Sequence, residues 1–180
     1  MPTAQLPRFV DNLDGTITDK TTCLTWEKKT GTVGASVDCS ATTCSDPYNV
    51  NNVYLWSSTG TLPNGDAFLD FLARVNGTLC DNATTVPTNW PCPSLGGHTD
   101  WRLPTLAEFQ TIFAAPFPCF SPCIDPIFGP TVGGVYWSSS TSLALYPAVA
   151  WIVHFGQGGA DDCCFKSSNK FYVRAVRGGK

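Results

Sequence analysis

Apolar side chains recur every three or four positions in two stretches of the chain, which is the spacing of a helix with one buried face. The first stretch covers residues 66–75, and Asn64 or Asp66 can cap its start. The second covers residues 105–114 and opens on a Thr-x-x-Glu capping box directly after a proline. The apolar positions of the two predicted helices are Phe68, Leu69, Phe71, Leu72 and Val75, and Leu106, Phe109, Ile112 and Phe113.

Short apolar runs that alternate with polar residues predict β-strands near the start of the chain. Residues 8–19 are predicted to form a hairpin, because an Asp-Gly pair supplies residues that tolerate positive φ in a tight turn. Residues 23–27 form the next predicted strand, with Trp26 directed into the core. Residues 30–64 are rich in Gly, Ser, Thr, Asn and Asp, so we expect a long irregular excursion there.

The stretch 136–177 places large apolar side chains where the surrounding Ser, Gly, Asp and Pro predict loops. Large apolar side chains are costly to expose, so they indicate either a folded-in loop or a contact surface. Near the middle lies a short apolar strand, in which successive side chains point to opposite faces. We therefore expect Trp151 and Val153 to point inward. Ile152 and His154 are expected to face solvent.

The composition limits the classes of protein and partner. A chain of 180 residues with a formal net charge of −3 and no basic run argues against nucleic-acid binding through phosphate contacts. No apolar run approaches the roughly 18 residues of a membrane-spanning helix, so no membrane insertion is expected. The first residues lack the apolar core of a secretion signal, so either a leader has been removed or the protein is intracellular.

Nine cysteines accompany 16 glycines and 14 prolines, a composition that indicates a loop-rich fold held by disulfides. The odd count leaves at least one thiol unpaired or joined to another chain. A zinc site would need further ligands, and His98 and His154 lie in no paired spacing, so we expect no metal and no cofactor. The predicted disulfide cysteines are Cys39 and Cys44, Cys80 and Cys92, and Cys119 and Cys123.

Two groups of residues invite a catalytic interpretation. His98, Asp100 and Arg102 form either a catalytic cluster or a turn in which Arg102 pairs with a carboxylate, and the lack of a nearby nucleophile favours the turn. Cys163 and Cys164 are the other tempting pair, although adjacent cysteines can form only a strained disulfide. We therefore expect no enzymatic activity.

Several separated blocks of the chain together resemble one family. They include Asp-Gly-Thr-Ile-Thr-Asp at 14–19, Thr-Asp-Trp-Arg-Leu-Pro-Thr at 99–105, Tyr-Trp-Ser-Ser at 136–139 and Tyr-Val-Arg-Ala-Val-Arg-Gly at 172–178. Over nearly its whole length the chain resembles the bacterial domain at the C-terminus of collagen-like adhesins. The resemblance implies a single domain over residues 1–180 with an α+β, C-type-lectin-like fold: two helices packed on short antiparallel sheets, with long irregular loops.

The resemblance extends to the variable proteins of diversity-generating retroelements, in which a C-terminal segment is mutagenised at template adenines and its variable side chains bind ligand. Asn codons randomised at their adenines cannot yield Trp, Gln, Glu, Lys or Met, so Trp151, Gln157, Lys166 and Lys170 should be fixed. The resemblance thus implies a variable face within residues 136–177. Its predicted residues are Leu143, Ala144, Leu145, Tyr146, Ala148, Val149, Ile152, His154, Ala160, Asp161, Asp162, Cys163, Cys164, Phe165 and Phe171.

Together these observations predict a non-catalytic module that displays a binding face to a protein or carbohydrate ligand. The collagen-like relatives imply an alternative, a surface adhesin domain that binds sulfated polysaccharide. Formylglycine-generating enzymes share the implied architecture, so an oxidoreductase is a third alternative. We expect the protein at the cell surface or outside the cell, as a monomer or a trimer.

Overall fold

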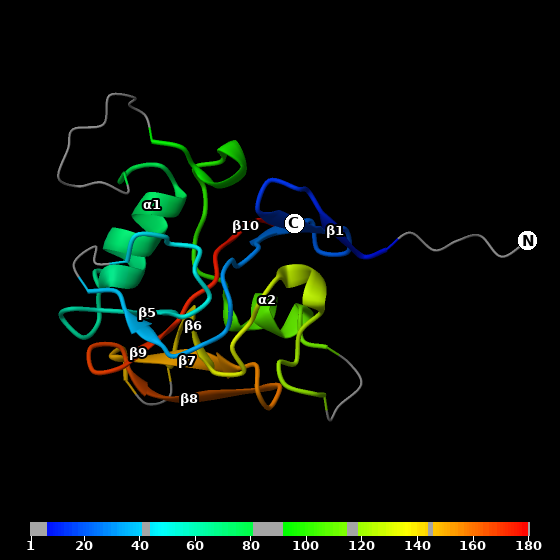
Figure 1. Ribbon diagram of the computed structural model, residues 1–180. Helices are drawn as coiled ribbons and strands as arrows, with labels where there is room; N and C mark the ends of the chain where they lie inside the picture. The colour runs from blue at the N-terminus through cyan, green and yellow to red at the C-terminus, as the bar shows by residue number, and fades with distance from the viewer. Residues whose placement is uncertain (1–6, 41–43, 81–91, 115–118, 144–145, 180) are drawn as a thin grey trace, which may run out of the picture.

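The computed structural model describes residues 7–40, 44–80, 92–114, 119–143 and 146–179. Over these residues the protein is α+β and mostly sheet (Figure 1), and no helix described there is long and apolar enough to cross a membrane. The strands are β1 (Phe9–Asp11), β2 (Thr16–Asp19), β3 (Leu24–Glu27), β4 (Val37–Asp38), β5 (Asn52–Leu55), β6 (Val135–Thr141), β7 (Val149–His154), β8 (Gly159–Phe165), β9 (Lys170–Tyr172) and β10 (Val176–Gly178). The helical elements are η1 (Ala67–Leu72), α1 (Ala73–Val75), η2 (Leu95–Gly97), α2 (Leu106–Thr111) and η3 (Pro126–Phe128).

The strands form two sheets. A four-stranded antiparallel sheet has the order β1-β2-β3-β10, and a six-stranded sheet has the order β4-β5-β9-β6-β7-β8. The larger sheet is mixed, not antiparallel as predicted, because β4 runs parallel to β5 and β6 runs parallel to β9. Strand β10 returns the chain to its first strands, so the C-terminal segment takes part in both sheets (Figure 1).

The predicted hairpin at the start of the chain is confirmed as β1 and β2. The Asp14 carboxylate accepts the N–H of Thr16 at 3.0 Å, and Gly15 has a φ of 86°, which glycine adopts without steric cost. The next predicted strand is β3, which pairs with β2 so that Trp26 lies opposite Ile17. Both side chains are fully buried, as expected for Trp26.

The excursion predicted over residues 30–64 contains an inner strand of the larger sheet, β5. Tyr54 and Trp56 are buried there. The indole N–H of Trp137 donates to the Tyr54 carbonyl at 2.9 Å, and that of Trp56 donates to the Ser138 carbonyl at 3.0 Å. Polar residues surround this short run, so the sequence alone does not mark it as a strand. Its partner strand β9 lies far later in the chain, and the two are paired only in the folded structure.

The first predicted helix is confirmed as η1 followed by α1, over Ala67–Val75, but its first six residues form a π-helix. The wider turn of a π-helix changes the buried face. Phe71 is fully buried, as predicted. Leu69, which was also predicted to lie on the buried face, is 65% exposed. Neither predicted cap is made: Asp66 forms no side-chain capping bond, and Asn64 directs its side-chain oxygen to the preceding turn.

The second predicted helix, α2, starts at the predicted capping box. Thr105 Oγ1 accepts the N–H of Glu108 at 3.2 Å, and Glu108 Oε2 accepts the N–H of Thr105 at 2.7 Å. Burial alone would raise the pKa of the Glu108 carboxyl, but hydrogen bonds from Arg102 and Thr105 hold it below its ordinary value. The helix ends at Thr111, earlier than predicted, because the following residues pair with the segment around Ile124.

Buried side chains gather on both faces of the larger sheet. Ile152 and Val153 are neighbours on β7 and therefore point to opposite faces. Ile152 belongs to a cluster that includes Phe71 of η1, and Val153 belongs to a second cluster that includes Phe109 of α2. A helix thus packs over each face of the sheet, so β7 has buried residues on both of its faces.

Disulfides close three small loops in this structure. They join Cys39 to Cys44, Cys80 to Cys92, and Cys119 to Cys123, the three pairs that the spacing predicts. The six cysteines lie outside the paired strands. Covalent closure of a loop stabilises a fold by restricting the unfolded chain.

We predict that Glu108→Gln lowers the free energy of unfolding by about 1 kcal/mol at pH 7, because it removes the charge that pairs with half-exposed Arg102. The folded-state pKa of Glu108 lies below its unfolded value. Its stabilising contribution is therefore present above about pH 4.3 and is lost as the pH falls through the folded-state pKa. Urea unfolding at pH 7 and at about pH 3 should show the two proteins converging in acid. An undiminished difference in acid would contradict the ionic origin.

Candidate functional site

The segment 136–177 supplies four neighbouring strands of the larger sheet, β9, β6, β7 and β8, with β8 at the edge (Figure 1). Strands β6 and β7 are joined by a loop whose described residues are 142–143 and 146–148, called the β6–β7 loop below. The loop lies against β8, because the Ser142 hydroxyl donates to the Asp162 carboxylate at 2.8 Å. Loop and edge strand therefore form one continuous surface.

The structure sorts the predicted site residues by exposure. Six are exposed: Leu143, Tyr146, Ala160, Asp161, Cys163 and Phe165. Five are half-buried: Ala148, His154, Asp162, Cys164 and Phe171. Val149 and Ile152 are buried, and Ala144 and Leu145 lie outside the described residues. Most of the described set is thus accessible, while two of its members belong to the core.

The prediction that Ile152 faces solvent is wrong. Ile152 is 5% exposed and Val149 is 4% exposed. Alternation along β7 separates its two faces correctly, but both faces are covered, so alternation does not separate core from solvent. Trp151, expected inside, is half-buried like His154, whereas Val153 is fully buried as predicted.

Three large exposed apolar side chains gather around the start of β7. Val149 lies opposite Phe165 in the β7–β8 pairing, and its N–H donates to the Tyr146 carbonyl at 3.1 Å. The Val149 carbonyl accepts the N–H of Ser142, the neighbour of Leu143, at 2.9 Å. Tyr146 and Phe165 are therefore paired with Val149 along the main chain, and Leu143 follows Ser142, which is paired with it as well. The three exposed residues thus lie in segments that meet at one end of the strand pair.

Strand β8 carries a bulge in the middle of this surface. Ala150 and Ile152, two residues apart on β7, pair with Cys164 and Asp161, which are three residues apart on β8. The extra residue re-aims the neighbouring side chains. An edge strand with a bulge and an exposed carboxylate resists pairing with another strand.

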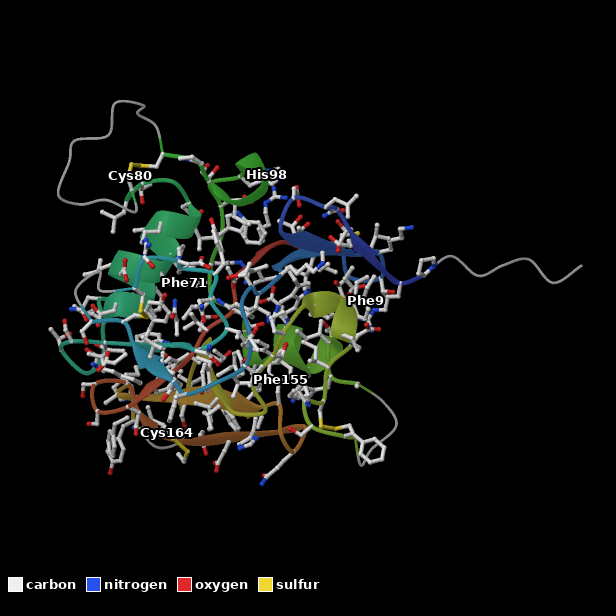
Figure 2. All side chains as sticks on the ribbon, viewed as in Figure 1. Phe9, Phe71, Cys80, His98, Phe155 and Cys164 are labelled. Carbon is white, nitrogen blue, oxygen red and sulfur yellow. A yellow bond between two sulfur atoms is a disulfide. The ribbon has the colours of Figure 1, made fainter. Side chains whose placement is uncertain are left out.

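The adjacent cysteines Cys163 and Cys164 are joined by a disulfide on β8. A bonded sulfur is not a thiolate, so neither cysteine is a nucleophile in this form. The unpaired cysteine is Cys23, which is exposed. Figure 2 shows Cys164 and His98 at opposite ends of the molecule, so the two groups with a catalytic interpretation are not brought together.

The cluster around His98 is a turn closed by ion pairs, as predicted. Arg102 donates to both carboxylate oxygens of Glu108, with Nη1 and Oε2 2.8 Å apart. Arg177 Nε lies 2.6 Å from Asp100 Oδ1, and this hydrogen bond lowers the pKa of the Asp100 carboxyl. The His98 side chain is exposed. Glu108 and Asp100 are therefore both engaged in ion pairs.

Comparison with known families decides where this chain belongs. The model of the Lcl C-terminal domain matches residues 15–177, from the turn after β1 to β10. The chain belongs to the Lcl C-terminal domain family. The Lcl C-terminal domain belongs to the wider family of diversity-generating-retroelement variable proteins and C-type-lectin-like domains. This confirms the resemblance found in the sequence. No curated protein and no solved structure matches the chain.

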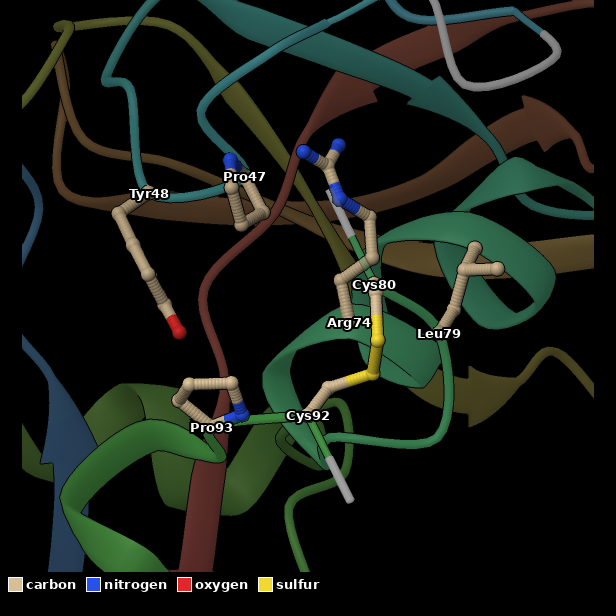
Figure 3. A pocket seen from close by; sticks show the side chains of 7 residues that line it. All are labelled: Pro47, Tyr48, Arg74, Leu79, Cys80, Cys92 and Pro93. Carbon is tan, nitrogen blue, oxygen red and sulfur yellow. A yellow bond between two sulfur atoms is a disulfide. The ribbon is translucent and has the colours of Figure 1, made fainter. Parts of the chain in front are cut away.

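This Lcl C-terminal domain also has a cavity of about 150 Å³ beside the Cys80–Cys92 disulfide (Figure 3). Arg74 lies in its wall and donates to the Ser45 carbonyl at 2.7 Å, so the guanidinium holds the excursion against α1. No described residue of the predicted variable face lines this cavity. Within the described parts of the chain, no group of three or more His, Cys, Asp or Glu side chains is placed to hold a metal ion.

Lys166 has a structural role in this Lcl C-terminal domain that the sequence did not predict. The sequence predicted only that this residue is fixed. It follows β8 directly, and it is 1% exposed. Its ammonium donates to Thr141 and to the Pro147 carbonyl, behind the β6–β7 loop. Burial lowers the pKa of this lysine. The sequence offered one signal for this residue: randomised Asn codons cannot encode lysine.

We predict that Ile152→Ala lowers the free energy of unfolding of this Lcl C-terminal domain by about 2–5 kcal/mol, because it leaves a cavity in a packed cluster. Leu143→Ala is the matched control and should change it by less than about 0.5 kcal/mol, since its side chain is in solvent. Urea unfolding of both variants measures the difference. Equal, small effects would contradict the burial of Ile152.

Proposed function

We propose that this protein is a non-catalytic binding module whose ligand-contacting surface is formed by the β6–β7 loop and β8. One observation carries the proposal: Leu143, Tyr146 and Phe165 are 98%, 65% and 52% exposed at one end of the β7–β8 pair. Grouped apolar side chains on the surface of a folded domain mark interaction sites. Covering them with a partner removes apolar area from water, which is favourable.

The scaffold of this surface is, in our proposal, a C-type-lectin-like fold. Three features support it: helices on both faces of the larger sheet, long loops, and a last strand that returns to the first strands. Membership of the Lcl C-terminal domain family supports it as well. Such a scaffold supports its loops through buried strands, which suits a surface that must keep its shape while its side chains differ.

The displayed residues are, in our proposal, the accessible members of the predicted set. Val149 and Ile152 leave that set, because a close-packed core tolerates few changes of volume. The described displayed residues are Leu143, Tyr146, Ala148, His154, Ala160, Asp161, Asp162, Cys163, Cys164, Phe165 and Phe171. Ala144 and Leu145 remain predictions from the sequence.

Sulfated polysaccharide is a less suitable ligand than a protein or an uncharged carbohydrate. Sulfate recognition uses cationic donors, above all arginine and lysine. Lys166 and Arg174 are 1% and 0% exposed. Lys170 and Arg177 each pair with an aspartate. The basic residues of the described C-terminal segment are therefore all engaged, and the exposed apolar group carries no cation.

An oxidising location at the cell surface or outside the cell fits this proposal. The four disulfides of the structure are bonds that persist in such compartments and are rare in the cytosol. The same bonds remove eight of the nine cysteines from thiol chemistry. That supports a binding module over an oxidoreductase.

We predict that the gene sequence differs among sibling strains at the displayed positions and not at Val149, Ile152 or Lys166. The reason is that the former side chains face solvent, whereas the latter are buried. Amplicon sequencing of the locus across strains measures this directly. Residues 120–135 serve as an internal control for the background rate of change. A uniform sequence over 143–171 would refute the variable-surface version of the proposal.

We further predict that the protein is not retained on heparin at low salt, because its C-terminal cations are buried or paired. The double variant Asp38→Asn, Asp100→Asn releases Lys170 and Arg177 from their carboxylates and is the matched comparison. It should bind at least as well as the native chain. Strong, salt-sensitive retention of the native chain would instead support the polysaccharide alternative.

A further inference from the structure

Lys166 is a fully buried lysine whose ammonium meets neutral groups. Lysine is almost never fully buried unless its charge has partners. Here Nζ donates to Thr141 Oγ1 and to the Pro147 carbonyl, both at 2.8 Å. It also lies 4.0 Å from the centre of the Trp56 ring. A cation held over an indole face is stabilised by the negative ring face, so all three contacts offset the cost of burying this charge.

These contacts bring three segments to one point. Thr141 ends β6, Pro147 belongs to the β6–β7 loop, and Trp56 follows β5. The backbone of Lys166 adds two further bonds: its N–H donates to the Ala148 carbonyl at 2.9 Å, and its carbonyl accepts the N–H of Ser57 at 3.0 Å. The residue therefore links the loop to the turn after β8 and to the inner side of the sheet.

Within the described residues of the β6–β7 loop, Lys166 bonds only to main-chain atoms, the carbonyls of Pro147 and Ala148. The loop is closed in the same manner, by the N–H of Ser142 on the Val149 carbonyl. Main-chain oxygens are present whatever side chain the residue carries. The grip of Lys166 on the loop is thus independent of the side chains that the loop displays.

We propose that Lys166 is a positioning residue that holds the β6–β7 loop through its main chain, so that displayed side chains can change while the loop keeps its conformation. The meaning of this clamp for ligand display rests on the proposed function, but the clamp itself is a property of the unliganded protein. Lysine suits the position because it combines a long apolar stem with donors for two oxygens. Methionine matches the stem and supplies no donor.

Amide hydrogen exchange by NMR tests the clamp on the full chain without ligand. Lys166→Met should speed exchange of the Ser142 and Val149 amides by about tenfold or more, the factor for loss of one hydrogen bond to a charged group. The Trp137 and Val153 amides, which lie in the middle of the sheet, should keep their protection. Lys170→Met is the matched control on the same segment and should leave the loop amides unchanged.

Two further variants separate the clamp from a general packing role. Thr141→Val keeps the lysine and removes one acceptor, and it should loosen the same amides selectively. The double variant Leu143→Ser, Tyr146→Ser changes displayed side chains and should leave loop exchange within about twofold of the native value, because the main-chain bonds persist.

Unchanged loop exchange in Lys166→Met would overturn the proposal. So would equal loosening of loop and sheet in both Lys166→Met and Thr141→Val, since that pattern marks a residue that only contributes to global stability. Loss of loop protection in the Leu143, Tyr146 double variant would overturn its independence from side chains. These outcomes are separate from the comparison of gene sequences among sibling strains, which can fail while the clamp stands.

Discussion

A buried carboxylate, that of Glu27 at the end of β3, joins the two sheets. Glu27 Oε2 accepts the N–H of Ala175 at 2.9 Å, and Oε1 lies 2.7 Å from Lys29 Nζ. The Glu27 carbonyl accepts a hydrogen bond from the Arg174 guanidinium at 2.7 Å. Residues 173–175 connect β9 of the larger sheet to β10 of the smaller one. Glu27 therefore holds, through its carboxylate and its main-chain carbonyl, the segment in which the chain crosses between the sheets. Burial lowers the pKa of Lys29 and opposes its charge, while Glu27 favours it. Breaking a buried ion pair from one side costs about 3–5 kcal/mol, which is a large part of the about 5–15 kcal/mol that stabilises a domain.

This crossing places the proposed ligand-contacting surface at the edge of the larger sheet. Because residues 173–175 are anchored inside, β9 is inserted between β5 and β6, and the remaining strands of the segment extend outward to β8. The inner strands are covered on both faces. The most exposed large apolar side chains of the segment are then at the edge strand and in the loop that precedes β7, while His154 on β7 and Phe171 on β9 are half-buried. The apolar side chains of Leu143, Tyr146 and Phe165 are exposed there because no further layer of the described chain covers them.

Different groups hold the β6–β7 loop in place and form the displayed surface. Support comes mainly from main-chain bonds, a buried lysine and buried strands, and presentation comes from the exposed and half-buried side chains of the displayed set. A loop held by its own side chains would lose its conformation when they change. The bonds from Lys166 to the Pro147 and Ala148 carbonyls have no such dependence, whereas the bond from Ser142 to the Asp162 carboxylate does. This arrangement gives a physical reason for a lysine at a position that randomised Asn codons cannot encode.

The sequence by itself determined the local elements and the family. The Asp-Gly turn of the first hairpin, the capping box at Thr105 and the three short disulfide loops each depend on neighbouring residues, so their chemistry can be recognised from spacing alone. Tertiary structure alone decided which faces are buried. Ile152 was misassigned because alternation identifies two faces and cannot tell that η1 covers one and α2 the other. Strand β5 and the contacts of Lys166 were missed for the same reason: their partners lie far away in sequence, and only the closed sheet brings them within bonding distance.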